Sequence, residues 1–428
     1  MMVEINKTAR SLGSVVGGGN VQENPPLRID NHEPAMLVSP GSSEEAAACL
    51  RVCSEAGLSV IPAGFMTWLD GGNLLRRADV VLSLRRMSRV IDYSPPDLTI
   101  TVEAGAPLAD LNSTALGEGQ WLPLDPPGHF NASVGAIVSC ASSGPLRFGF
   151  GTVRDYVIGL RLAHADGSLS KSGGRVVKNV AGYDMNKLYV GSFGSLAVIT
   201  EATFKLRPMP DTAITLMVEG AHSRLATVAE AVLAEGLQPA SVVISSELAD
   251  GPGGEGPYRH ALLLRFVETE QAVRHQVDRA LRLSGRGAAL LEGAPQEQAW
   301  RERAELERFG DSIARVSLPV SKARGFVEEM LSSRSARFIM ADMASGIIRA
   351  ALRGEGSEGG EAAGRIKELR ADARKLGGTL FIERAALPVR EQAGAWDEVG
   401  ETSGLMTAIK TKFDPRGVLN PGRFVEGI

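Results

Sequence analysis

The chain has 428 residues, 44% of them hydrophobic, and a formal net charge of −4. This length is more than one hydrophobic core usually organises, so we expect two or three globular domains. Because charges of both signs are interspersed, the composition argues against a nucleic-acid partner. Three cysteines are too few for a disulfide framework, which favours a reducing, cytoplasmic compartment.

The sequence also argues against a membrane-spanning or secreted chain. No run of about 18 apolar residues is present, so no transmembrane segment is expected. The first residues contain Glu4 and lack the apolar stretch of a secretory signal.

The first half of the chain reads as alternating strands and helices after a flexible lead-in, residues 1–30, that is marked by glycine and proline clusters. The next elements form a β-α-β unit: strand 35–39, capped helix 42–56 and strand 59–63. Further strands are predicted at 79–84, 98–103, 157–165 and 198–206, with a helix at 108–116.

After Pro210, two strand-helix-strand sets predict a mixed α+β domain built over one sheet. Its strands are expected at 213–218, 240–246, 262–267 and 379–382, and its helices at 223–236, 270–283, 295–308 and 366–376. The charged helix at 295–308 is predicted to be a solvated face, with contact to a partner subunit as the alternative.

A loop that leaves the strand at 59–63 is the first candidate for ligand binding. It reads Pro62-Ala63-Gly64-Phe65-Met66-Thr67. Successive backbone N–H groups in such a turn form a concave nest for phosphate, and glycine lets the backbone approach closely. A plain turn is the alternative.

Three further segments are rich in small residues, glycine or proline. They are 123–128 with Pro126, 133–136 with Ser133-Val134-Gly135, and 142–152 with Ser142-Ser143-Gly144-Pro145 and Thr152. Small residues permit a flat ring to lie against the main chain, although close packing in a core would also explain them.

The longest such stretch, residues 173–208, reads GGRVVKNVAGYDMNKLYVGSFGSLAVITEATFKLRP. Its turns and glycines are more than an ordinary connection needs, which points to a large, partly anionic cofactor. Within it, Lys178, Asp184 and Lys187 are expected either to touch phosphate or ribose or to order the turn.

Taken together, these segments resemble the PCMH-type FAD-binding domain shared by the vanillyl-alcohol oxidase and p-cresol methylhydroxylase flavoproteins. Within that family they look most like the E subunit of bacterial glycolate oxidase. The resemblance covers most of residues 35–210 and the tail, and is weak across 211–385. The stretches that carry it are PAG…TWLDGGN (62–73), WLPLDPP (121–127), SGPLRFGFGTVRD (143–155), GGRVVKNVAGYDMNKLYVGSFGSLAVIT (173–200) and FDPRGVLNPGRF (413–424).

The resemblance implies an α+β fold in which a two-subdomain FAD-binding domain is followed by an α+β cap domain with an antiparallel sheet. The expected boundaries are 31–210 for the FAD-binding domain, 211–385 for the cap, and 386–428 for a tail that returns to the FAD-binding domain. By the same resemblance, pyrophosphate lies on 63–67, the ring and ribityl chain lie on 133–135 and 142–145, and adenine lies near Gly194 and 198–200. The cofactor-binding residues implied are Pro62, Ala63, Gly64, Phe65, Met66, Thr67, Pro126, Ser133, Val134, Gly135, Ser142, Ser143, Gly144, Pro145, Thr152, Gly194, Val198, Ile199, Thr200 and Asn420.

The phosphate loop departs from the family pattern. It usually reads Gly-small-Gly-Thr, whereas Phe65 and Met66 here replace the small residue and the second glycine. Both side chains would crowd a diphosphate, and a left-handed conformation is costly for either residue. The loop has no histidine at the place of covalent attachment, so the resemblance implies non-covalent FAD.

Histidines are also absent where hydroxy-acid-oxidising relatives carry them. The last of the six is His275, whereas the D subunit of the same oxidase carries histidines and a glutamate beyond that point, which hold a divalent metal. We therefore expect no metal site, and no side chain stands out as a catalytic base. His129 adjoins the expected cradle and is either a flavin contact or an ordinary turn residue.

Two other motifs are given structural interpretations. Cys49 and Cys53, four residues apart on one helix, are expected to be buried small apolar residues. The glycine-rich run 251–256 is interrupted by proline and followed by a strand, so we interpret it as a loop rather than a nucleotide motif.

Three functions are compatible with these residues. The first is a FAD-binding subunit of a glycolate (2-hydroxy acid) oxidase complex. It would pass electrons from substrate, or from a D-type flavin subunit, to an iron–sulfur subunit that supplies the clusters. Through those partners the complex could sit at the inner face of the membrane. The second is a non-catalytic scaffold that has lost FAD, and the third is a stand-alone oxidase of a polyol or aldehyde.

Overall fold

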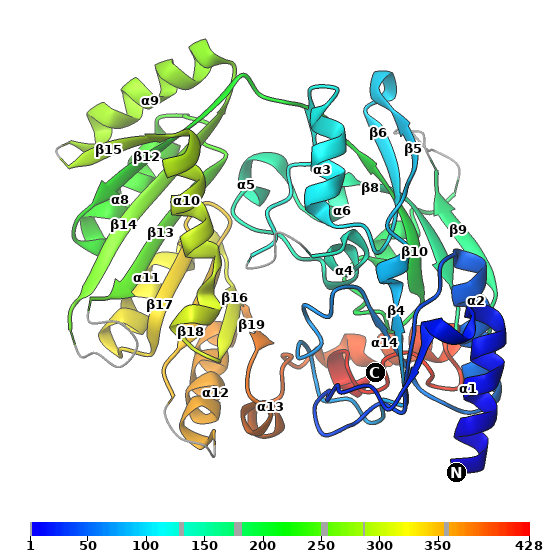
Figure 1. Cartoon of the computed structure of the whole chain (residues 1–428). Helices are drawn as coiled ribbons and strands as arrows, with labels where there is room; N and C mark the ends of the chain where they lie inside the picture. Colours follow the sequence, from blue (N-terminus) through cyan, green and yellow to red (C-terminus); the bar gives the residue numbers. More distant parts are fainter. Residues whose placement is uncertain (1, 128–131, 175–181, 250–255, 286, 355–358) are drawn as a thin grey trace. The chain divides into compact units, whose positions relative to one another are not determined.

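The computed structural model describes residues 2–127, 132–174, 182–249, 256–285, 287–354 and 359–428. The chain divides into two compact units. Figure 1 shows the chain coloured by sequence from the N-terminus to the C-terminus. Unit 1 comprises Met1–Ser142, Thr152–Met209 and Glu398–Ile428, and unit 2 comprises Ser143–Gly151 and Pro210–Asp397. Unit 1 is thus assembled from three stretches of chain, the last of which follows unit 2 in the sequence.

The first sheet of unit 1 has the order β1-β2-β4-β3. Its strands are β1 (Val21–Glu23), β2 (Met36–Val38), β4 (Val80–Ser83) and β3 (Val60–Ala63). Strands β2, β4 and β3 are parallel, and β1 pairs antiparallel with β2. Between β2 and β3 runs α2 (Ser43–Glu55), so the predicted β-α-β unit is present.

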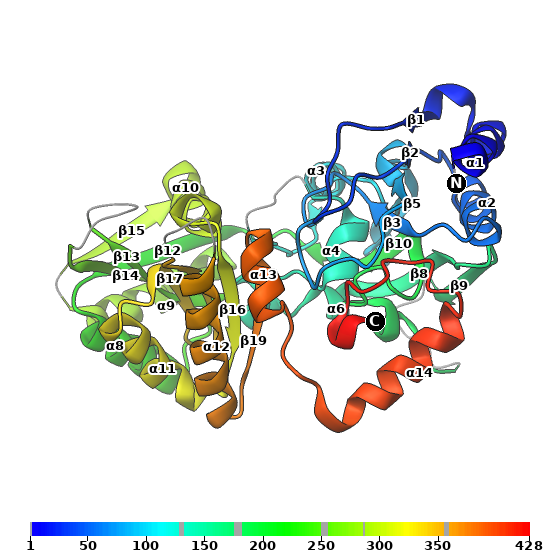
Figure 2. The same cartoon turned by 90° about the horizontal axis from the view of Figure 1, so that it is seen from below.

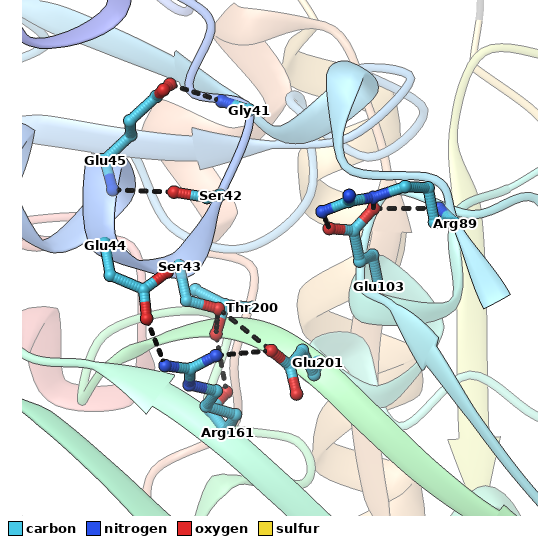
Figure 3. Close-up of polar contacts among 10 residues, drawn as sticks. All are labelled: Gly41, Ser42, Ser43, Glu44, Glu45, Arg89, Glu103, Arg161, Thr200 and Glu201. Atoms are coloured by element: carbon cyan, nitrogen blue, oxygen red, sulfur yellow. Dashed lines mark hydrogen bonds and ion pairs between the residues drawn. The ribbon is translucent and has the colours of Figure 1, made fainter. Parts of the chain in front are cut away.

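The start of α2 is capped as its sequence predicts. The Ser42 hydroxyl accepts from the Glu45 backbone N–H at 3.1 Å, and the Glu45 carboxylate accepts from the Gly41 N–H at 2.7 Å (Figure 3). The cap satisfies N–H groups that have no partner within the helix.

Residues 2–23 do not form the flexible lead-in that the sequence predicts. They contain helix α1 (Met2–Val16), which packs against α2, the short helix η1 (Gly18–Asn20) and strand β1. Ala9, Leu12 and Val16 are buried, and their spacing places them on one face of α1. The glycine and proline clusters that suggested a lead-in lie after this helix.

The second sheet of unit 1 is antiparallel throughout, in the order β5-β6-β10-β8-β9. Its strands are β5 (Val90–Ser94), β6 (Thr99–Glu103), β10 (Val198–Lys205), β8 (Val157–Ala163) and β9 (Leu169–Gly173). The two sheets are the two subdomains that the family resemblance implies.

Shorter elements complete unit 1. They are η2 (Leu84–Arg86), η3 (Pro95–Asp97), α3 (Leu108–Leu116), β7 (Gln120–Trp121), α4 (Val134–Cys140), α6 (Val153–Tyr156), α7 (Asn186–Tyr189), β11 (Arg207–Pro208), η5 (Gly400–Thr402), α14 (Ser403–Phe413) and η6 (Val425–Gly427). Residues 418–420 of the tail run beside β3, because the Val60 N–H donates to the Val418 carbonyl and the Asn420 N–H donates to the Val60 carbonyl.

Unit 2 is built on one antiparallel sheet of eight strands in the order β15-β12-β14-β13-β17-β18-β16-β19. The strands are β12 (Thr212–Glu219), β13 (Ser241–Leu248), β14 (Tyr258–Glu268), β15 (Ala288–Glu292), β16 (Ile313–Ser317), β17 (Ala336–Asp342), β18 (Ile347–Leu352) and β19 (Thr379–Arg384). The helices are α5 (Arg147–Phe150), α8 (His222–Ala234), α9 (Glu270–Ser284), α10 (Gly293–Ala304), η4 (Leu306–Phe309), α11 (Val320–Ser332), α12 (Gly360–Lys375) and α13 (Leu387–Ala393).

The connectivity of unit 2 is duplicated. Strands β12 to β15 with α8 and α9 form one β-α-β-β-α-β set, and β16 to β19 with α11 and α12 form another. Within each half the sheet order is the same, read from opposite edges, and β13 and β17 join the halves. The sequence predicts repeated strand-helix-strand sets but contains no exact repeat.

The described residues of unit 2 form one large core and two smaller clusters. Alternate residues of the strands pack with α8, α9, α11 and α12 into the large core. The other face carries a smaller cluster in which Val243, Phe338 and Met340 pack with Trp300 of α10. Figure 2 shows α10 on the opposite side of this sheet from α8, α11 and α12.

Candidate functional site

Unit 1 contains a pocket at the meeting point of four segments. These are the end of β3 with the loop after it, helix α4, the segment from Phe193 to the start of β10, and the C-terminal tail. Eleven of the cofactor-binding residues implied by the sequence line it: Pro62, Ala63, Gly64, Met66, Thr67, Ser133, Gly135, Gly194, Val198, Ile199 and Asn420. Segments that lie more than 350 residues apart in the sequence thus share one pocket.

Two glycines allow these segments to approach one another. A Cβ atom on Gly64 would lie 2.0 Å from the Ser133 hydroxyl oxygen. A Cβ atom on Gly135 would lie 2.7 Å from the Cβ of Ala104. Both distances are below any real contact, so these positions need glycine because the loop after β3, α4 and the end of β6 pack closely.

The backbone around the pocket is strained. Met66, Phe193 and Asn420 line the pocket with φ values of 64°, 52° and 43°, and Ala141 follows α4 with a φ of 49°. A side chain in this left-handed region costs about 1–2 kcal/mol, and such residues cluster at functional sites. Met66 occupies the position where the family pattern has glycine. Its left-handed backbone carries the conformational free-energy cost that the sequence predicts for a side chain there.

The pocket offers hydrogen-bonding groups that the protein itself does not use. Within the described residues, the backbone N–H groups of Met66 and Thr67, which line the pocket, make no hydrogen bond. The Asn420 amide donates through Nδ2 to the Phe193 carbonyl at 2.6 Å, while its buried Oδ1 has no hydrogen-bond partner. Because buried polar atoms without partners are rare, the Asn420 Oδ1 fits a bound ligand that donates a hydrogen bond, and the two loop N–H groups are available to an acceptor.

The two bulky residues of the phosphate loop differ in direction. Phe65 is 36% exposed and does not line the pocket, and the guanidinium of Arg85 lies 5.1 Å from the centre of its ring. Met66 does line the pocket. Of the two residues that depart from the family pattern, only Met66 therefore contributes to the wall of the pocket.

The remaining residues of the implied set are not among those that line the pocket. Val134 is buried within α4, and Pro126 is buried. Thr152 starts α6, where its hydroxyl and N–H both donate to the Asp155 carboxylate. Ser142 belongs to unit 1 outside the pocket lining, and Ser143, Gly144 and Pro145 belong to unit 2.

Thr200 is also directed elsewhere, for a local reason. Ile199 pairs with Leu162 and Glu201 with Arg161, so Thr200 is the extra residue of a β-bulge in β10. The bulge leaves Val198 and Ile199 on the pocket while the Thr200 hydroxyl donates to the Arg161 carbonyl at 3.2 Å and accepts from Ser43 at 2.9 Å.

Thr200 belongs to a polar network that joins helix α2 to strands β8 and β10 of the five-stranded sheet (Figure 3). Arg161 of β8 donates to Glu201 at 2.7 Å and to Glu44 at the start of α2. Ser43 bonds to Thr200 and Glu201. This network fixes α2 against the strand that carries Val198 and Ile199, so it supports the pocket from behind.

A second ion pair holds the end of β6. Glu103 is 2% exposed and accepts from the Arg89 guanidinium at 2.7 and 3.1 Å and from the Arg89 N–H at 2.8 Å (Figure 3). Glu103 precedes Ala104, which lines the pocket. Bidentate geometry of this kind orients both side chains.

Several pocket residues were not in the implied set: Trp68, Ala136, Ser139, Cys140, Phe193 and Arg423. Helical spacing from Ser133 could have found three of them, because Ala136, Ser139 and Cys140 follow on the same helix. The buried Arg423 has no such signal. Its guanidinium pairs with Asp30 at 3.2 Å and donates to the carbonyls of Asn73 and Leu69, which fastens the tail to the loop.

Other residues singled out in the sequence have structural partners or lie outside the described residues. Lys187 pairs with Asp184 at 2.5 Å on the surface, which fits a role in ordering the turn. Lys178, His129 and most of the run 251–256 lie outside the described residues. Cys49 and Cys53 are buried in α2, where burial raises the pKa of the Cys49 thiol to about 12 and that of Cys53 as well.

In the described part of the chain, no group of three or more histidine, cysteine, aspartate or glutamate side chains is arranged to hold a metal ion. Every described helix is too short or too polar to cross a bilayer.

Comparison with known proteins shows what this chain is similar to. Residues 34–173 match the profile of the FAD binding domain. The fold is that of the PCMH-type FAD-binding proteins. It aligns with p-cresol methylhydroxylase with substrate bound at a TM-score of 0.75, covering 99% of this chain and 97% of that one at 15% identity. The fold that the sequence implies is therefore confirmed.

Two curated relatives are glycolate oxidase subunits. Subunit GlcD of Bacillus subtilis is 27% identical over 425 residues, covering 91% of this chain and 88% of its own length. Subunit GlcE of Escherichia coli is 40% identical over 140 residues, covering 32% of this chain and 40% of its own length. The chain is thus a relative of FAD-dependent oxidoreductases, similar to one subunit over nearly its whole length and to the other more strongly over a shorter stretch.

Proposed function

We propose that the chain is a FAD-dependent oxidoreductase subunit of a glycolate oxidase-type complex that oxidises a small 2-hydroxy acid. The observation that carries the proposal is the pocket of unit 1. Many of its lining residues lie in the stretch that matches a FAD binding domain, and it contains hydrogen-bonding groups that the protein does not use. The similarity to glycolate oxidase subunits supports the substrate class and the complex.

The residues of the pocket fit FAD in three ways. The N–H groups of Met66 and Thr67 would hold the pyrophosphate, as backbone nests hold anions. The small residues around Ser133 and Gly135 would receive the flat ring, and the Asn420 Oδ1 would accept a hydrogen bond from the cofactor. When bound, FAD supplies the redox chemistry, and the chain supplies binding and orientation.

We propose that FAD is held without a covalent bond. The loop from Ala63 to Thr67 has no histidine to attach it. Acid or heat denaturation should therefore release all flavin absorbance into the supernatant, and flavin that stays with the precipitated protein would contradict this.

We assign the chain to the E-type role in the complex. Because no histidine follows His275, it lacks the residues that would hold a divalent metal against a hydroxy acid in a D-type subunit. With three cysteines it also cannot ligate an iron–sulfur cluster, which needs about four. The proposal therefore includes a D-type flavin subunit and an iron–sulfur subunit as partners, in the cytoplasm or at the inner face of the membrane.

Cys140 provides a direct test of where FAD binds. It is the one cysteine of three that lines the pocket, whereas Cys49 and Cys53 are buried with raised pKa values. Added FAD should slow alkylation of Cys140 by iodoacetamide, measured by peptide mass spectrometry, and adenosine alone should protect it less. Equal labelling with and without FAD would place the cofactor elsewhere.

The visible spectrum of the purified chain tests the function itself. A flavin spectrum, or uptake of added FAD, supports the proposal, and a colourless chain that takes up none favours a scaffold role. If FAD is bound, reduction by a polyol or aldehyde without partner chains would instead favour a stand-alone oxidase. Reduction by glycolate only after the partner subunits are added is the expected result.

A further inference from the structure

Lys410 is the one residue of α14 that is buried, and it lies outside the pocket. Its neighbours on the helix are exposed or partly exposed, and its own exposure is 9%. A lysine is rarely buried unless it is paired, because removing an ammonium group from water is costly. The sequence and the proposed chemistry give this residue no role.

The Lys410 ammonium group uses all three of its donors. It donates to the Ser195 carbonyl at 2.7 Å, to the Leu419 carbonyl at 2.8 Å and to the Asp414 carboxylate at 2.7 Å. An ammonium group has three donors and no acceptor, so no hydrogen-bonding capacity is left for a ligand or water.

The acceptors of Lys410 adjoin two residues that line the pocket. Ser195 follows Gly194, and Leu419 precedes Asn420. On the pocket side the same two segments are joined by the hydrogen bond from Asn420 to the Phe193 carbonyl. The two segments are therefore tied together twice, once facing the pocket and once behind it.

Asp414 completes the tie. Its carboxylate is fully buried and accepts from the N–H groups of Val418 and Leu419 at 2.9 and 2.8 Å, in addition to Lys410. It therefore folds the tail into the turn that brings Val418 and Asn420 beside Val60 of β3.

We propose that Lys410 is a positioning residue for the cofactor pocket. It clamps the tail at Leu419 onto the segment at Ser195, and so holds Asn420 and Gly194 at their places in the pocket. Burial lowers the pKa of Lys410 while Asp414 opposes that shift, which is consistent with a charged amine kept by its partner. The inference that the clamp serves FAD rests on the proposed function, whereas the clamp itself does not.

The test compares Lys410→Met with Lys412→Met, which removes an exposed lysine from the same helix. We expect Lys410→Met to weaken FAD binding about ten- to hundredfold, because charge-assisted hydrogen bonds are lost. Hydrogen exchange of the apoprotein should become faster in peptides that cover residues 415–424. Lys412→Met should change neither. Wild-type exchange and FAD affinity in Lys410→Met would overturn the proposal.

A double variant separates positioning from charge balance. Removing Lys410 alone leaves the Asp414 charge buried without its partner, which can prevent folding. Lys410→Met with Asp414→Asn removes both charges, so it should fold but still bind FAD weakly and exchange fast in the tail. Wild-type FAD affinity in this variant would overturn a positioning role.

The two measurements, hydrogen exchange in the tail and FAD affinity, also distinguish a failure of this proposal from a failure of the proposed function. If the wild-type chain binds no FAD, the proposed function fails, and exchange in the tail still decides whether Lys410 fastens it. If the wild type binds FAD and the tail of Lys410→Met exchanges faster with unchanged FAD affinity, the clamp exists but does not serve the cofactor.

Discussion

The two units of the chain differ in how regular their backbone is. Of the nine non-glycine residues with a left-handed backbone among the described residues, eight lie in unit 1 and only Arg334 lies in unit 2. Unit 2 repeats one regular β-α-β-β-α-β arrangement, whereas unit 1 gathers short segments around a pocket. Left-handed backbone thus concentrates in unit 1, and three of its eight residues, Met66, Phe193 and Asn420, line the pocket.

The largest effect that distinguishes the units should come from two helical glycines. Gly135→Ala in α4 should destabilise unit 1 by about 1–3 kcal/mol, because the new Cβ would meet Ala104 at 2.7 Å. Gly364→Ala in α12 should stabilise unit 2 by up to about 1 kcal/mol, because no atom lies within 4 Å and alanine favours helix. Differential scanning calorimetry measures both. A stabilising effect of Gly135→Ala would contradict the close packing in unit 1.

Met66→Gly tests whether the strain belongs to the pocket. It should relieve about 1–2 kcal/mol of backbone strain and free ligand space, so FAD retention should increase in equilibrium dialysis. Leu98→Gly is the matched control, because Leu98 also has a positive φ in unit 1 but does not line the pocket. It should leave FAD affinity unchanged. Unchanged or weaker retention in Met66→Gly would count against crowding by this side chain.

A smaller effect concerns the pH dependence of the stability of unit 2. His222 and His260 lie against each other in unit 2, with ring centroids 5.6 Å apart, and burial lowers the pKa of both. Above the ordinary histidine pKa of about 6.5, both are neutral in the folded and unfolded states. As pH falls below that value the unfolded chain binds protons that the folded chain resists, so stability decreases.

His222→Leu should reduce this loss of stability between about pH 6.5 and 5, measured by urea unfolding at each pH. Glu328 and Arg324 also act on the pKa of His222, with opposite signs, and remain in this variant. His275→Leu on the exposed side of α9 is the control and should keep the wild-type profile. The same pH profile in both variants would show that the buried pair is not the cause.

The smallest expected effect concerns the outer side of the phosphate loop. Arg85→Ala removes the contact of its guanidinium with the Phe65 ring, which is worth about 0.5–1 kcal/mol at an exposed site. FAD affinity should fall about two- to fivefold at most, which is the factor that this energy gives. A loss as large as that expected for Lys410→Met would mean that Phe65 has a larger role in the pocket than its exposed position indicates.

Local patterns made most of the fold predictable. The capped helix after Ser42, the strand at β3 and the strand-helix-strand sets of unit 2 follow from apolar periodicity and turn residues, which act over short distances. That the sheet of unit 2 is antiparallel was implied only by the family resemblance. The exception was α1, whose buried face is set by residues that precede a glycine cluster. Its helical spacing was present in the sequence, but glycines and prolines after it suggested a loop.

The site was less predictable than the fold, because its geometry depends on long-range packing. The bulge at Thr200 turns that side chain away from the pocket, and no residue in β10 announces it. Arg423 reaches the pocket through contacts with Asp30 and Leu69, which are almost 400 and about 350 residues away in the sequence. Glycine and small-residue patterns predicted many of the residues that line the pocket. The hydrogen bonds and ion pairs that hold these segments together could be identified only from the structure.

The dependence of the pocket on the tail has a consequence for biosynthesis. Asn420 and Arg423 are made after the whole of unit 2, although they line a pocket whose other walls are complete by residue 199. A ribosome-bound chain that has finished β10 therefore still lacks two of the residues that line the pocket. We expect flavin to enter only after release of the tail from the ribosome, so chains truncated before residue 418 should leave the ribosome without cofactor.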